Sequence, residues 1–183
     1  MSPGHTGEGR GVVLVGSRGT GKSTVGRLLS GRLGLPFVDA DPALEARFGC
    51  SIRSIFEEHG EPIFRDREQQ VVAELTAGPP TVLATGGGVV LRPENRAMLR
   101  RFGFVVWLSA DPSVLAARLA ASPQGLADRP ALTPAGTLAE IAAVLTARAA
   151  LYREVADAEV ATDARSVDEV VEAVARLVPG VGS

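Results

Sequence analysis

The sequence predicts an α/β fold with three layers, α/β/α, in which helices cover both faces of a five-stranded parallel sheet. Two observations predict it. Short apolar, β-branched runs alternate with segments of helical periodicity over nearly the whole chain, as in consecutive βαβ units. The first of these runs ends in a glycine-rich loop that leads directly into a helical segment. The length of 183 residues suits one hydrophobic core and is short for two ordinary domains.

Five runs are expected to form the strands, because each combines apolar residues with flanking turn residues or an adjoining helical pattern. In chain order they are Gly11–Val15, Pro36–Asp39, Thr81–Thr85, Phe104–Leu108 and Ala158–Thr162. Helical spacing of apolar residues predicts the segments between and after them. These helices are Lys22–Leu33, one that Pro42 opens, Ile63–Leu75, Pro93–Arg101, Pro112–Ala120, Thr137–Val155 and Val167–Leu177.

Composition excludes several classes of partner. A formal net charge of -2 gives no basis for a nucleic-acid partner, and no apolar run is long enough to cross a membrane. Residues 1–10 are polar and Gly-rich, so we expect a disordered tail and not a secretory signal. The single Cys50 cannot form an internal disulfide, which agrees with a reducing environment. A cytoplasmic protein is therefore expected.

The strongest motif is a phosphate-binding loop (P-loop) at Gly16–Ser23. Its residues, GSRGTGKS, match G-x-x-x-x-G-K-[ST] at every fixed position and lie between a strand and a helix, as the motif requires. Lys22 is the only lysine among 19 cationic side chains. Its ammonium is a compact charge that fits between two phosphates, whereas a guanidinium is a wide fork. The loop therefore predicts binding of a nucleoside triphosphate, and the lack of any other lysine excludes the N-K-x-D element of GTPases.

Polar residues after the later strands predict an acceptor site, because ligands of open parallel sheets bind at the carboxyl ends of the strands. Asp39 and Asp41 follow the second strand and could serve a metal ion and an attacking hydroxyl, although Asp41 could equally be the N-cap before Pro42. Arg65 and Glu68 share a helix face, so a salt bridge is the alternative there. Glycines 86–88 expose backbone directly after the third strand.

Together these residues resemble the shikimate kinase family. The resemblance is carried, in register, by the P-loop, Asp39/Asp41, Phe64-Arg65, Gly86–Gly88, Arg129-Pro130 and Arg148-Ala149-Ala150-Leu151-Tyr152. It implies the strand order 2-3-1-4-5, one kinase domain over residues 11–178, a substrate-binding region at about 41–70 and a mobile lid at about 121–134. It also implies transfer of the ATP γ-phosphoryl group to the 3-hydroxyl of shikimate, with Mg²⁺ as cofactor.

The resemblance also implies a role for each matching residue. Catalytic roles fall to Lys22, Asp41 and Arg129. The residues expected to bind ATP are Gly19, Thr20, Gly21, Lys22, Ser23, Thr24, Arg118, Arg129 and Arg165. Those expected to bind shikimate are Asp41, Arg65, Gly86, Gly87, Gly88 and Arg148. Ser23 and Asp39 are expected to hold the Mg²⁺ ion.

Three alternatives remain at this stage. A kinase for a related hydroxy-carboxylate, of the aminoshikimate or gluconate type, would use a similar carboxylate site. A nucleoside-monophosphate kinase shares the scaffold, but we would expect more lid arginines and a base pocket. An inactive nucleotide-binding protein is the non-enzyme alternative, and the intact Lys22, Ser23, Asp41 and Arg129 argue against it. We expect a monomer whose ligands are ATP and shikimate, without nucleic-acid or membrane partners.

Overall fold

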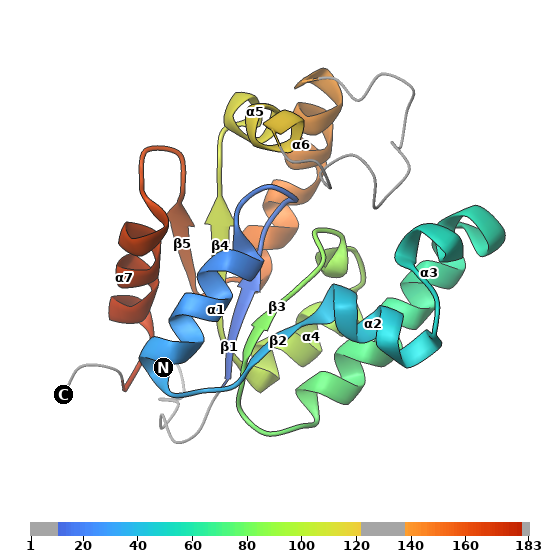
Figure 1. Ribbon diagram of the computed structural model, residues 1–183, viewed down its shortest axis with the longest axis horizontal. Helices are drawn as coiled ribbons and strands as arrows, with labels where there is room; N and C mark the ends of the chain where they lie inside the picture. Colours follow the sequence, from blue (N-terminus) through green and yellow to red (C-terminus); the bar gives the residue numbers. More distant parts are fainter. Residues whose placement is uncertain (1–10, 122–137, 181–183) are drawn as a thin grey trace.

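The computed structural model describes residues 11–121 and 138–180. Five parallel strands form one sheet in the order β2-β3-β1-β4-β5, as predicted (Figure 1). The strands are β1 (Gly11–Val15), β2 (Phe37–Asp39), β3 (Val82–Ala84), β4 (Gly103–Ser109) and β5 (Ala158–Ala161). The helices are α1 (Lys22–Leu33), α2 (Ala40–Phe48), α3 (Ile52–Thr76), the 3₁₀ helix η1 (Val89–Leu91), α4 (Pro93–Phe102), α5 (Pro112–Ala121), α6 (Leu138–Val155) and α7 (Val167–Leu177).

The alternation of β1 side chains divides the core into two layers. Val12 and Leu14 pack on one face of the sheet with side chains of α1 and α7. Val13 and Val15 pack on the other face with side chains of α3, α4 and α6. Every residue of β1 is buried, as expected for a central strand of a parallel sheet with helices on both sides. A third cluster joins α2 to α3 beside the sheet.

Two local predictions are wrong. The expected helix Ile63–Leu75 is only the second part of α3, which begins at Ile52 and is interrupted at Gly60, where φ is 77° and ψ is 176°. Asp41 is not an N-cap: α2 begins at Ala40, and the Asp39 carboxylate caps it by accepting the Asp41 backbone N–H at 3.2 Å. The helix therefore begins directly after the last residue of β2, two residues before Pro42.

Some sequence predictions lie outside the described residues. The tail at 1–10 is one, and the lid at 121–134 is another except for Ala121, the last residue of α5. Arg129 belongs to this segment, so its predicted role stays a prediction. Across the described ranges, no helix is both long enough and apolar enough to span a bilayer.

Close contact between β1 and β4 generates a stability prediction. Gly11 and Gly103 are paired in register, and a Cβ at Gly103 would overlap the Gly11 carbonyl oxygen. We expect Gly103→Ala to lower the free energy of unfolding by about 1–3 kcal/mol, the usual cost of overpacking. Urea unfolding measures the difference.

Gly31→Ala is the matched control, because Gly31 is exposed in α1 and a Cβ there meets nothing within 4 Å. It should raise the free energy of unfolding by about 0.5–1 kcal/mol through helix propensity. Equal unfolding midpoints for the two variants would contradict the packing argument.

Candidate active site

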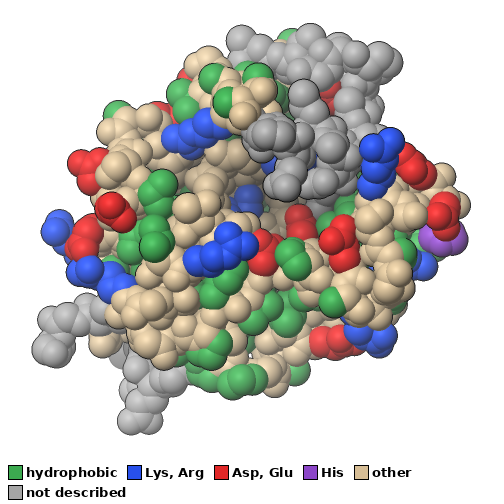
Figure 2. Space-filling model, in the orientation of Figure 1, with side chains coloured by type: hydrophobic (Ala, Val, Ile, Leu, Met, Phe, Trp, Pro, Cys, Tyr) green, Lys and Arg blue, Asp and Glu red, His purple; other side chains and the backbone are tan. Residues whose placement is uncertain are grey.

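A cavity of about 590 Å³ opens at the carboxyl ends of the strands. In Figure 2, cationic and acidic side chains gather around a hollow near the centre of this face. The residues that line the cavity come from the P-loop and the start of α1, from the end of β2 and α2, from the first residue of α3, from the segment after β3, and from α5. They are Arg18, Gly19, Gly21, Lys22, Ser23, Thr24, Asp39, Asp41, Pro42, Glu45, Ile52, Thr85, Gly86, Gly87, Arg118 and Leu119.

The P-loop wraps around the Lys22 ammonium. Three of its glycines, at positions 16, 19 and 21, have positive φ angles between 85° and 144°, which side chains rarely tolerate. This backbone path directs the carbonyl oxygens of Gly16 and Ser17 toward Lys22, whose Nζ donates to each at 2.8 Å. The buried lysine is thereby held at the N-terminus of α1, where the helix dipole also favours an anion.

Ser23 and Asp39 form the pair of oxygens predicted to hold a metal ion. The Ser23 hydroxyl donates to Asp39 Oδ2 at 2.5 Å, and both residues line the cavity. Magnesium ions are commonly held by one or two protein oxygens, with waters and substrate phosphates completing the shell. The pair fits that mode of binding. Within the described ranges no group of three or more His, Cys, Asp or Glu side chains gathers to hold a metal.

Arg118 connects the P-loop to the segment after β5. Its guanidinium donates to the Thr162 hydroxyl at 2.9 Å, to the Thr162 carbonyl at 2.8 Å and to the Gly19 carbonyl at 3.3 Å. The Thr162 hydroxyl in turn donates to the Ser109 carbonyl. Arg118 therefore lies at the rim of the cavity, next to the P-loop. Arg165 is exposed and contacts the Ala161 carbonyl at 3.4 Å, outside the residues that line the cavity.

Arg65 is buried in α3 between two carboxylates. Its Nη1 donates to Glu68 at 2.7 Å, while Nε and Nη2 donate to one oxygen of Glu61 at 3.1 and 2.9 Å. Burial lowers the pKa of Arg65, but the charge and hydrogen bonds of Glu68 and Glu61 outweigh it and raise the pKa above its usual value. The salt bridge expected as an alternative is present, so the side chain is both paired and oriented.

The three glycines after β3 serve different contacts. Gly86 and Gly87 line the cavity, whereas Gly88 lies against the Arg65 guanidinium, which a Cβ at Gly88 would overlap. The Gly87 carbonyl accepts a hydrogen bond of 2.5 Å from the Tyr152 hydroxyl. The close packing of Arg65 therefore explains why the residue at position 88 is a glycine.

Tyr152 brings the two predicted carboxylate-binding arginines together. It is fully buried, stacks on Trp107 with ring centroids 5.6 Å apart, and places its hydroxyl within reach of the charges of Arg148 and Arg65. Burial raises the pKa of the Tyr152 phenol, and the neighbouring Ser17 hydroxyl and the two arginines only partly oppose this effect. The phenol thus lies where the P-loop, the Gly87 carbonyl and both arginines meet.

The structure gathers most of the predicted residues but not all of them. Lys22, Ser23, Thr24, Asp39, Asp41, Gly86, Gly87 and Arg118 line one cavity with Gly19 and Gly21. Thr20 is buried inside the P-loop, where its hydroxyl donates to the Ser17 carbonyl. Arg65, Gly88 and Arg148 adjoin this cavity through Gly87 and Tyr152, without lining it. Sequence reasoning missed Thr162 and Glu61 as partners of site arginines. No local pattern relates Thr162 to Arg118, 44 residues away, whereas the i,i+4 spacing of Glu61 and Arg65 could have indicated their pair.

Comparisons with known proteins agree with this geometry. A family model described as shikimate kinase matches residues 18–178. The shikimate kinase of Symbiobacterium thermophilum is 48% identical over 160 residues, which cover 87% of this chain and 91% of that protein. A structure of shikimate kinase from Acinetobacter baumannii in complex with shikimate superposes with a TM-score of 0.85 at 36% identity, covering 92% of each chain. A gluconokinase from Sinorhizobium meliloti shares the fold, with a TM-score of 0.52 and 20% identity over 92% of this chain and 93% of that one.

The raised pKa of Tyr152 generates a prediction about pH, which is simple to follow because the chain has a single tyrosine. In the unfolded chain the phenol loses its proton near pH 10, whereas the folded protein holds that proton to higher pH. The Tyr152 phenol therefore makes its full contribution to the free energy of unfolding below about pH 10. This contribution falls as pH rises further, by at most about 1.4 kcal/mol per pH unit. Urea unfolding at several alkaline pH values measures this slope.

Tyr152→Phe is the control, since it keeps the buried ring and removes the titrating group. Its free energy of unfolding should fall less steeply above pH 10 than that of the wild type. Phenolate absorbance in the wild type should appear together with unfolding. A phenolate that forms near pH 10 while the protein stays folded would contradict the burial argument.

Proposed function

We propose that this chain, which belongs to the shikimate kinase family, transfers the γ-phosphoryl group of ATP to the 3-hydroxyl of shikimate. Membership of the family makes it an ATP-dependent phosphotransferase. The observation that carries the choice of acceptor is the pair of arginines, Arg65 and Arg148, that flank the Tyr152 hydroxyl next to Gly87. Such a pair suits a small carboxylate held beside a triphosphate site.

The donor half of the site is the P-loop. Backbone N–H groups of the loop and of the α1 N-terminus cradle the phosphates, and Lys22 neutralises charge between the β- and γ-phosphates. Ser23 and Asp39 hold Mg²⁺, which when bound neutralises the β- and γ-phosphate oxygens. Arg118 packs against the adenine from its position on Gly19 and Thr162. Arg165 contributes to ATP binding from the segment after β5.

The acceptor half supplies orientation. Arg65 and Arg148 bind the carboxylate of shikimate, and the backbone of glycines 86–88 borders the ring hydroxyls. Asp41 lines the same cavity as Gly86 and Gly87, and it orients the 3-hydroxyl. Binding through the carboxylate thus presents one hydroxyl to the γ-phosphate and keeps the others away from it.

The reaction exchanges one phosphorus–oxygen bond for another. The 3-hydroxyl oxygen of shikimate forms a bond to the γ-phosphorus in line with the breaking bond to the β–γ bridging oxygen, so ADP leaves and the hydroxyl proton passes to Asp41 or to solvent. The protein contributes little covalent chemistry to this transfer. Lys22 and Arg129 stabilise the charge that spreads over the transferring group, and alignment accounts for most of the acceleration.

The expectation of a cytoplasmic, monomeric enzyme stays a prediction. Its support is compositional: a single half-buried cysteine, Cys50, and a net charge near zero.

An acceptor panel tests the proposed function. ATP consumption should depend on shikimate, and shikimate 3-phosphate should be the product identified by mass spectrometry. Aminoshikimate, quinate, gluconate and CMP should each be used at least about tenfold less efficiently, a difference of about 1.4 kcal/mol in transition-state binding. Equal or better use of gluconate or CMP would overturn the assignment to shikimate.

Two variants serve as controls for that assay. Lys22→Ala and Asp41→Ala should remain folded and lose at least about 100-fold in kcat, because each removes a group that acts on the transferring phosphoryl or on its acceptor. Circular dichroism checks the fold. Turnover near the wild-type level in either variant would show that the activity comes from another site or another protein.

Arg65→Ala separates acceptor binding from donor binding. We expect the KM for shikimate to rise by about 10–100-fold, the cost of a charged hydrogen-bonding partner, while the KM for ATP changes less than about twofold. Steady-state kinetics with each substrate varied in turn measures both constants. Arg67→Ala is the control, because Arg67 lies on the same helix and contacts the Cys50 thiol and the Phe48 ring instead. Equal losses for shikimate and ATP would contradict the carboxylate role.

A further inference from the structure

We infer that Glu61 occupies on Arg65 the place of the acceptor's carboxylate, and that the acceptor binds by displacing it. This inference rests on the proposed function, since it concerns the same acceptor site. It concerns a residue outside the set expected from the sequence, and it assigns that residue an effect on acceptor affinity and selectivity.

The Glu61 carboxylate covers the side of Arg65 that suits a carboxylate ligand. Nε and Nη2 form one edge of the guanidinium, and both donate to Glu61 Oε1, at 3.1 and 2.9 Å. A ligand carboxylate commonly binds such an edge through two parallel hydrogen bonds. Glu61 therefore makes the contact that the acceptor needs.

The Nη1 atom of Arg65 also has a carboxylate partner. Nη1 donates to Glu68 at 2.7 Å, and Gly88 lies so close to the Nη1 and Nη2 atoms that a Cβ there would overlap them. Only 10% of the Arg65 side chain is exposed, and Arg65 is not among the residues that line the cavity. Binding of a carboxylate through the Nε/Nη2 edge of Arg65 thus depends on removing Glu61 from that edge.

Charge favours the same exchange. Two carboxylates share the single positive charge of Arg65, which leaves this cluster with a formal charge of about -1 from its three groups. Arg148, which lies near the same Tyr152 hydroxyl, brings the formal charge to zero, and an acceptor carboxylate that joined both glutamates would leave an excess negative charge in a poorly hydrated place. If Glu61 moves into water as the acceptor enters, the charge around Arg65 stays the same.

Glu61, not Glu68, is the partner able to leave. The Glu61 side chain is 44% exposed, whereas that of Glu68 is 6% exposed and lies in the core side of α3. Gly60, directly before Glu61, has the non-helical angles that interrupt α3, and Pro62 after it has no N–H to donate. Glu61 therefore lies at a break between two helical segments, where a change of direction disturbs few backbone hydrogen bonds.

This arrangement makes the acceptor site selective for anions. The apparent dissociation constant of the acceptor equals the intrinsic constant divided by the fraction of molecules in which Arg65 is open. A carboxylate acceptor recovers the hydrogen bonds and charge that Glu61 gives up. A neutral molecule of the same shape recovers neither, so it does not displace Glu61, and its affinity does not depend on the fraction of molecules in which Arg65 is open.

Calorimetric binding of shikimate and of its neutral carboxamide, without ATP, tests the inference. Glu61→Gln keeps the size of the side chain and removes its charge, so it should weaken the competition for Arg65. We expect shikimate to bind Glu61→Gln about 3–10-fold more tightly than the wild type, and its KM to fall to the same extent. Affinity for the carboxamide should change less than about twofold, and so should the KM for ATP.

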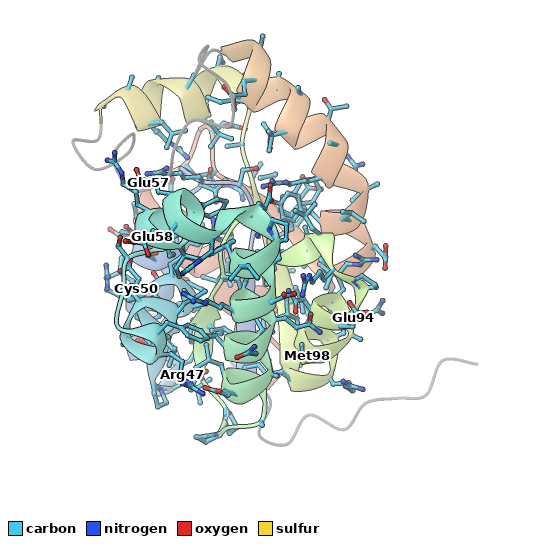
Figure 3. All side chains as sticks on the ribbon, turned by 90° about the vertical axis from the view of Figure 1, so that its right-hand side faces the viewer. Arg47, Cys50, Glu57, Glu58, Glu94 and Met98 are labelled. Carbon is cyan, nitrogen blue, oxygen red and sulfur yellow. The ribbon has the colours of Figure 1, made fainter. Side chains whose placement is uncertain are left out.

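Glu57→Gln is the matched control. Glu57 is on the same helix, α3, before the break at Gly60. It pairs with Arg53 four residues before it at 2.7 Å, and its side chain is 53% exposed. Figure 3 shows Glu57 at the outer edge of α3. This variant removes the same charge from an arginine pair that has no place in the site, and its shikimate affinity should equal that of the wild type.

The outcomes separate the inference from the proposed function. Shikimate that binds Glu61→Gln no more tightly than Glu57→Gln, or more weakly than the wild type, would overturn the displacement and make Glu61 a fixed support for Arg65. Equal tightening of shikimate and its carboxamide would also overturn it, because the effect would not depend on the carboxylate. A wild-type protein that neither binds nor phosphorylates shikimate would instead overturn the proposed function, and the inference with it.

Discussion

The parallel pairing of β1 with β3 determines where the polar groups of the site lie. Leu14 in β1 pairs with Ala84 in β3, and its carbonyl accepts from both the backbone N–H and the hydroxyl of Thr85. This register brings the P-loop after β1 and the glycines after β3 to the same edge of the sheet. Since β2 pairs with β3 in turn, Asp39 reaches the same edge, where it contacts Ser23.

The two halves of the cavity are held by different kinds of interaction. Backbone groups support the donor half: the Lys22 ammonium rests on two P-loop carbonyls, and Arg118 rests on the carbonyls of Gly19 and Thr162. Side-chain carboxylates support the acceptor half, where Glu61 and Glu68 hold Arg65. Carbonyl oxygens carry partial charges and stay with the loop when phosphates arrive, whereas carboxylates carry full charges that compete with an anionic ligand.

The sequence predicted the fold and the position of the P-loop between β1 and α1 correctly, because both depend on short-range patterns. The P-loop is contiguous, its strand is a continuous apolar run, and its helix has apolar residues at helical spacing. The acceptor half was predicted residue by residue from the resemblance, but not its contacts. That Gly88 makes room for Arg65, and that Tyr152 donates to Gly87, depends on the packing of α3 and α6 against the loop after β3. Such contacts join residues up to 65 positions apart, so no local pattern contains them.

Burial explains why Arg65, in the acceptor half, needs a carboxylate partner. An arginine that is only 10% exposed is costly without a carboxylate beside it, and Glu68, itself buried, meets that need whether or not a ligand is bound. Glu61 is not required to neutralise the charge of Arg65, because Glu68 already does so. The contribution of Glu61 therefore lies in the orientation of the Arg65 guanidinium and in its availability to a ligand. Its place beside Gly60 supports this reading, because a purely structural ion pair gains nothing from a break in the helix that carries it. The position of Arg65 is thus maintained by a buried partner, and its availability is governed by an exposed one.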